Sequence, residues 1–174
     1  MEMRWKCSRC DEWHTGLPDV AFHAPVYYDM ASPDERERDF QLTSDTCVMI
    51  ENGVRHFFVR TVMFMPILDT LESFSWGVWI SLSQSNFEKY VSLKDPTVIA
   101  AEPLYVGWLS NRINHYPDTL NLKARIKLQS NGHRPHLELE PTNHPLAVEQ
   151  HKGISLARAQ EIATWALHSR PSEP

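Results

Sequence analysis

The chain has few cysteines, no long apolar run and no excess of positive charge. Its 174 residues include only three cysteines, too few for the disulfide framework of a small secreted domain. No stretch approaches 18 consecutive apolar residues, so we expect no transmembrane helix. Residues 1–10 lack the apolar core of a secretory signal. These absences predict a cytoplasmic protein that does not bind membranes.

The charge and the missing motifs exclude further classes. The net charge is −5 and the isoelectric point is about 6.0, whereas general nucleic-acid binders usually carry a basic surface. We therefore do not expect a nucleic-acid partner. The sequence also has no GxSxG, P-loop, GxGxxG or HExxH motif. None of the enzyme classes marked by those motifs is indicated.

The main chemical signal is a CxxC pair near the N-terminus. A two-residue spacing lets both thiolates turn toward one point, as in zinc knuckles. A third cysteine and a nearby histidine would complete a tetrahedral Cys3His site, so zinc is the predicted cofactor. The predicted metal ligands are Cys7, Cys10, Cys47 and His14.

The identity of the fourth ligand is open at this point. His14 is nearest in sequence, and Asp45 and His56 are the alternatives. Four protein ligands would make a closed structural site, whereas three ligands and a water could be catalytic. Without a metal, the pattern would be an ordinary surface CxxC with one buried cysteine. A thioredoxin-like redox role is disfavoured because no βαβ pattern surrounds the pair.

The hydrophobic pattern predicts an α+β fold. We expect a mainly antiparallel sheet of about five to seven strands, with a packed C-terminal helix and an N-terminal zinc knuckle. The chain reads as a single domain, 1–174, with a knuckle segment at 1–18 and a frayed tail at 169–174. Strands are predicted near 47–50, 56–60, 74–82, 105–109, 120–128 and 135–140, helices near 33–38, 83–91 and 156–167, and a loop over 94–103.

Two other groups of residues were candidate sites. Trp76, Trp79 and Trp108 lie beside glycines and could wall a ligand pocket, although strand tryptophans more often fill a core. His144 and Glu149 could act as an acid/base pair. The simpler interpretation of this pair is a loop capped by its own side chains, with Glu149 stabilising a helix dipole.

Several longer strings resemble a known family. They are Cys7-x-x-Cys10-x-x-x-His14-x-Gly-Leu-Pro18, Ser44-Asp45-x-Cys47, His56-Phe-Phe-Val-Arg60, Trp76-Gly-Val-Trp79-Ile-Ser-Leu-Ser83, Gly107-Trp-Leu-Ser110, Tyr116-Pro-Asp-Thr-Leu120 and His144-Pro-Leu-Ala-Val-Glu-Gln150. Over residues 5–168 the chain resembles the bacterial domain-of-unknown-function family 2199. It departs from the family pattern at Asp11, where glycine is expected. The resemblance implies a small cytoplasmic bacterial protein and carries over no activity.

These observations lead to two expected functions. The first is a zinc-stabilised cytosolic binding or interaction protein without catalysis, with a protein as partner. The alternative is a metal-assisted, hydrolase-like enzyme that uses an open zinc position or the His144/Glu149 region. A structural zinc would have four protein ligands, and a catalytic zinc would keep an open position in a cleft. Whether the chain is an enzyme stays open on the sequence alone.

Overall fold

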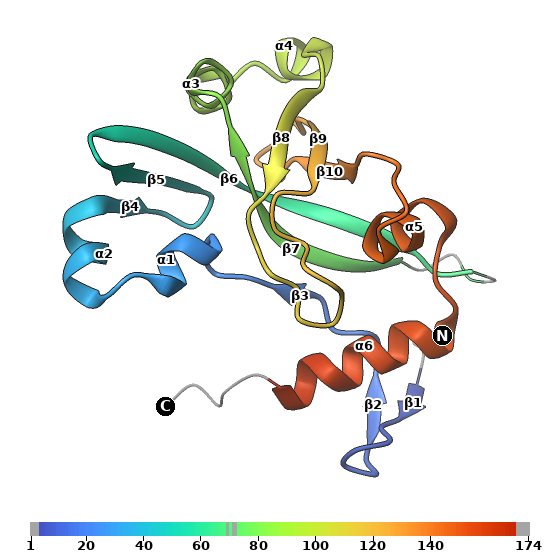
Figure 1. Ribbon diagram of the computed structural model, residues 1–174. Coiled ribbons are helices and arrows are strands. Elements are labelled where there is room, and N and C mark those ends of the chain that lie inside the picture. The colour runs from blue at the N-terminus through green and yellow to red at the C-terminus, as the bar shows by residue number, and fades with distance from the viewer. Residues whose placement is uncertain (1–3, 69, 71–72, 170–174) are drawn as a thin grey trace.

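A sheet that closes into a barrel organises the fold (Figure 1). The computed structural model describes residues 4–68, 70 and 73–169. The elements in chain order are β1 (Arg4–Lys6), β2 (Trp13–Thr15), β3 (Val20–Ala21), α1 (Val26–Met30), α2 (Pro33–Asp39), β4 (Phe40–Leu42), β5 (Thr46–Glu51), β6 (Val54–Pro66), β7 (Ser73–Leu82), α3 (Gln84–Ser92), α4 (Pro96–Ala101), β8 (Tyr105–Leu109), β9 (Lys123–Lys127), β10 (His136–Leu139), α5 (Pro145–Lys152) and α6 (Leu156–Ser169).

Strands β6 to β10 form the ring of the barrel. Each is antiparallel to the next, and β10 returns to pair with β6 at His136 and Val62. A meander with an odd number of strands runs its first and last strands in the same direction, so this closing pair is parallel. Beyond β6 the sheet continues with β5 and then β4, and β3 pairs in parallel with β7.

The predicted combination of helices and strands is confirmed, but the predicted sheet was only partly right. Among the described residues the sheet has eight strands rather than five to seven, and it is a closed, mixed barrel in which β10–β6 and β3–β7 pair in parallel. Hydrophobic alternation shows that a strand has a buried face, but it does not indicate which strands close a ring. Residues 94–103 were expected to form a loop, but they include helix α4. The Asp95 carboxylate caps the start of this helix by accepting the N–H of Thr97 over 2.8 Å.

The hairpin and the main strand agree with the sequence. Asn52 and Gly53, with φ of 50° and 79°, make the turn between β5 and β6. On β7, the alternate residues from Phe74 to Leu82 enter the main core, and Trp79 points to the other face. There Trp79 joins a second cluster with Cys47, Met49 and Phe58.

Gly107 allows the barrel to close between β7 and β8. A Cβ at this position would collide with the backbone carbonyl oxygen of Ser81 and with the side chain of Ile80. Glycine is therefore required by the close approach of two backbones.

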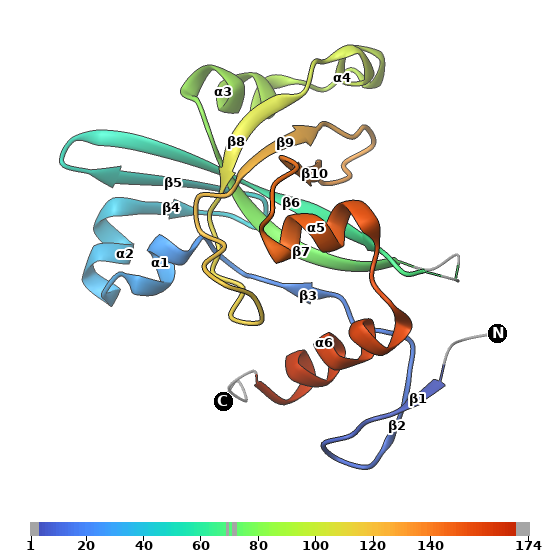
Figure 2. The same cartoon turned by 45° about the vertical axis from the view of Figure 1, so that its right-hand side comes forward.

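The C-terminal helix α6 packs as its apolar stripe predicts. Ala159, Ile162, Ala163 and Ala166 are buried. Both views place α6 beside the N-terminal hairpin of β1 and β2 (Figures 1 and 2), and Ala163 contacts the cluster of Trp5 and Cys7. Of the predicted tail, residues 170–174 lie outside the described part of the chain. In that described part, no helix is long and apolar enough to cross a membrane.

Candidate metal centre

The CxxC pair occupies the turn of the β1–β2 hairpin. The strands pair in register from Arg4↔Thr15 to Lys6↔Trp13. Within the turn, Cys7 N–H donates to Glu12 O over 2.9 Å and Asp11 N–H donates to Cys7 O over 3.1 Å. Asp11 adopts a φ of 60°, in the left-handed region that favours glycine. This conformation agrees with the expectation of glycine at this position.

Three of the four predicted ligands come together here. The donor atoms of Cys7, Cys10 and His14 all lie within 4.8 Å of one another. Cys10 Sγ is 3.4 Å from His14 Nε2. Cys7 is buried, and Cys10 and His14 are half-buried. These three side chains therefore lie close enough to hold one metal ion, and they form the single such group among the residues that the structure describes.

The local electrostatics favour one thiolate at neutral pH. Burial opposes ionisation of Cys7, but the backbone N–H groups of Cys10 and Arg9 and the side chains of His168 and Cys10 outweigh it and bring the pKa of Cys7 to about 6. At Cys10 a backbone hydrogen bond from Glu12 favours the thiolate, yet burial and the neighbouring Cys7 together raise its pKa. An already ionised sulfur is a ready metal ligand.

The C-terminal helix supplies a histidine that the sequence analysis missed. His168 Nε2 lies 3.2 Å from Cys7 Sγ, across 161 residues of sequence. Thr164 is one turn earlier on the same helix, and its Oγ1 is 3.9 Å from the same sulfur. No spacing rule could join His168 to the CxxC pair, because packing of α6 on the hairpin brings them together.

Cys47 is not part of this group, and its expected place beside the CxxC pair was wrong. Its side chain is fully buried in the second core cluster, with Phe58 and Trp79, on the sheet. The cluster of Cys7 is a separate one, formed with Trp5 and Ala163. Burial raises the pKa of the Cys47 thiol to about 12, so it stays protonated. Cys47 acts as a small apolar core residue here.

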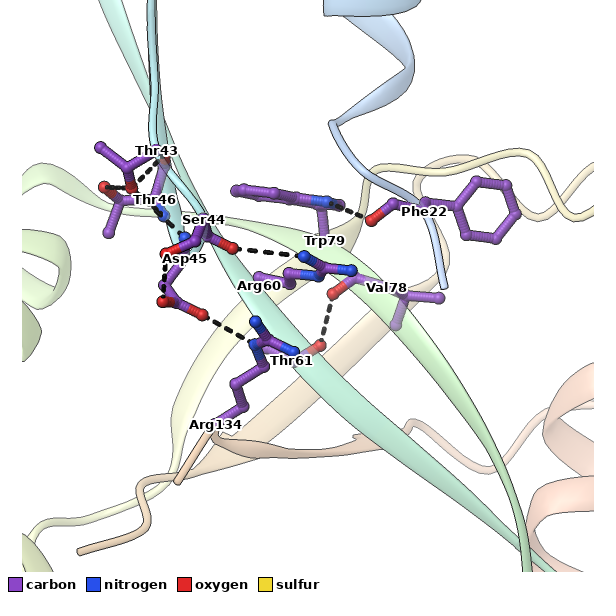
Figure 3. A network of polar contacts seen from close by, with 10 residues as sticks. All are labelled: Phe22, Thr43, Ser44, Asp45, Thr46, Arg60, Thr61, Val78, Trp79 and Arg134. Atoms are coloured by element: carbon purple, nitrogen blue, oxygen red, sulfur yellow. Dashed lines mark hydrogen bonds and ion pairs between the residues drawn. The ribbon is translucent and has the colours of Figure 1, made fainter. Parts of the chain in front are cut away.

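The two rivals of His14 also lie elsewhere. Asp45 accepts a hydrogen bond from Arg134 Nε over 2.7 Å, in the polar network beside Arg60 (Figure 3). His56 stands on β6, with its Nε2 3.8 Å from a carboxylate oxygen of Glu51. Of the three candidates for the fourth ligand, only His14 lies beside the cysteine pair.

The His144/Glu149 region is occupied by structural contacts. His144 is the N-cap of α5, and its Nδ1 accepts the N–H of Leu146 over 3.2 Å. Glu149 accepts hydrogen bonds from Tyr116 and Arg158, one on each carboxylate oxygen. The two residues thus have separate partners rather than each other.

The tryptophans divide between core and surface. Trp76 and Trp79 are fully buried, and the Nε1 of Trp79 donates to Phe22 O over 3.1 Å. Trp108 is 45% exposed on the outer face of β8. The first two therefore fill cores, and of these three tryptophans Trp108 is the one available to a partner.

The comparison with family models decides the relationship. The model described as "uncharacterized protein conserved in bacteria (DUF2199)" matches residues 6–154. The chain belongs to this family. The match includes Cys7, Cys10 and His14 of this DUF2199 protein, and it ends before helix α6. No curated protein and no solved structure matches the chain.

Proposed function

We propose that this DUF2199 protein is a zinc-stabilised, cytosolic binding protein without catalytic activity. The observation that carries the proposal is the mutual approach of Cys7, Cys10 and His14 within 4.8 Å. Thiolate and imidazole donors together select zinc over the hard cations magnesium and calcium, which prefer oxygen.

A metal would do structural work at this place. Strands β1 and β2 have three residues each, and an isolated hairpin of that length is unstable in water. Zinc binding contributes its free energy directly to folding of the segment that holds the ligands. The bound ion would thereby fix the N-terminal hairpin against the rest of the protein.

The outer face of β8 and β9 supports a protein partner. Val106 and Trp108 are 41% and 45% exposed on the same face of β8. The cations beside them are neutralised, because Lys123 lies 3.2 Å from Glu140 and Arg125 lies 3.7 Å from Glu138. Nucleic acid would need unpaired cations on this face, whereas a folded protein can cover aromatic and mixed-charge groups.

The contacts of His144 and Glu149 do not support the acid/base form of the hydrolase alternative. An acid/base pair needs a group free to exchange a proton with substrate. The Glu149 carboxylate is engaged by Tyr116 and Arg158 on both oxygens, and the Nδ1 of His144 caps α5, which leaves His144 only a buried Nε2.

The test is metal content combined with thermal unfolding. The chain is purified without a histidine tag under reducing conditions, beside Cys10→Ser and the control Ser8→Ala, an exposed position in the same turn. We expect about one zinc per chain in the wild type and in Ser8→Ala, and none in Cys10→Ser, because one group of ligands builds one site. Chelation should lower the melting temperature of the wild type and of Ser8→Ala, and it should leave that of Cys10→Ser unchanged. A wild-type chain without zinc, or one whose melting is indifferent to chelation, would contradict the proposal.

A further inference from the structure

His168 approaches the group of Cys7, Cys10 and His14 from the side of Cys7. It lies in the last turn of α6, half-buried, with Nε2 3.2 Å from Cys7 Sγ. On the other side of the group, Cys10 Sγ is 3.4 Å from His14 Nε2. In a tetrahedral site with bonds of about 2.0–2.3 Å, neighbouring ligand atoms are about 3.3–3.8 Å apart. Both contacts are close to such an edge of a tetrahedron.

We propose that His168 is the fourth zinc ligand and closes a Cys2His2 centre that fastens the C-terminal helix to the N-terminal hairpin. The inference rests on the zinc binding proposed above. It makes the centre a structural one, because four protein ligands leave no position for a reactive water.

Packing of α6 holds His168 in place for this role. Thr164 and His168 are four residues apart, so both project from one side of the helix, and both contact Cys7 Sγ. Ala163 packs against Trp5 and Cys7 in the same cluster, which brings the helix close to the hairpin. The helix thus already holds the His168 ring against the sulfur of Cys7.

The two ends of α6 are then held by different means. Near its start, Arg158 Nε donates to Glu149 Oε1 over 2.9 Å, which requires no metal. Near its end, His168 would be held by zinc. Removal of zinc should loosen residues 164–169 while the first turns of the helix stay docked. A purely structural histidine beside a sulfur would not give this pattern.

The experiment compares wild type, His168→Ala, His168→Cys and His56→Ala. His56 lies on the sheet beside Glu51 and serves as the matched control. Zinc affinity is measured by competition with a chelator, and hydrogen exchange of α6 is followed with and without zinc. We expect His168→Ala to lose at least 10–100-fold in affinity, the loss that even an outer-shell partner causes. His56→Ala should match the wild type.

The coordination itself is read from the Co²⁺-loaded proteins. His168→Cys should still bind the metal, with stronger thiolate-to-cobalt absorption because the site gains a third sulfur. In the wild type, zinc should protect the amides of residues 164–169, and in His168→Ala it should not.

The outcomes separate the two proposals. Suppose that the wild type binds zinc and that His168→Ala keeps the same zinc affinity and the same zinc-dependent protection of α6. That result would overturn the role of His168 but not the zinc-binding proposal. A wild type that takes up no zinc would overturn the binding proposal and this one with it. If His168→Ala fails to fold, the Co²⁺ spectrum of His168→Cys decides, since an absorption identical to that of the wild type rules out ligation at this position.

Discussion

Arg158 Nε donates a hydrogen bond to Glu149 Oε1 over 2.9 Å and so joins the start of α6 to α5. The same carboxylate accepts the hydroxyl of Tyr116, and the guanidinium of Arg158 also reaches His115 Nε2 at 2.8 Å. The helix is therefore held by a polar contact as well as by its apolar stripe.

Replacing Arg158 should destabilise the fold measurably. In Arg158→Met the free energy of unfolding should fall by about 1–3 kcal/mol, because a partly buried carboxylate loses a charged hydrogen-bond donor. Arg125→Met is the control, since its pair with Glu138 is half exposed and 3.7 Å long. That variant should change stability by less than about 0.5 kcal/mol in urea titrations. Equal losses in the two variants would contradict this account of α6.

His115 should make stability depend on pH. Burial, and then the charge of Arg158, lower the pKa of His115 from its ordinary value of 6.5, although Glu161 and Glu149 oppose this. The unfolded chain then binds more protons than the folded chain as pH falls below about 6.5, so stability declines there. In His115→Gln the decline between neutral pH and pH 5 should be smaller than in the wild type, and both chains keep the metal ligands. Identical pH profiles would show that His115 does not contribute.

Ile162 is the central apolar anchor of α6. It is fully buried, so Ile162→Ala should cost on the order of 2–4 kcal/mol and Ile162→Asp should prevent folding. Leu167→Ala is the matched control on the same helix, because Leu167 is 41% exposed and should change stability by less than about 0.5 kcal/mol. An unchanged melting curve for Ile162→Asp would mean that the apolar face of α6 that carries Ile162 points outward.

Cys47 should be dispensable for the metal. The structure places it in the second core cluster, with a pKa raised to about 12 by burial. Cys47→Ala should keep about one zinc per chain in metal analysis and lose only about 1 kcal/mol of stability from the core. Loss of the zinc in this variant would return Cys47 to the ligand set.

Local patterns in the sequence predicted local structure well. The Asn52-Gly53 turn, the helix start at Ser32 and the two faces of β7 each depend on residues a few positions apart. The CxxC spacing likewise placed Cys7 and Cys10 together, and His14 joined them through the hairpin register.

Features that depend on tertiary packing were not predictable. The parallel closure of β10 on β6 and the contact of His168 with Cys7 join segments far apart in the chain. Cys47 was misplaced for a related reason, because a third cysteine near a CxxC pair suggests a ligand although nothing in its spacing fixes its direction. The alternative of one buried cysteine holds for Cys47, which is buried in a different cluster from Cys7.

X-ray absorption at the zinc edge of the natively purified chain tests the central claim most directly. The account predicts one zinc bound by two sulfurs at about 2.3 Å and two imidazole nitrogens at about 2.0–2.1 Å, from Cys7, Cys10, His14 and His168. A chain without zinc, or a zinc shell with three sulfurs, would contradict it.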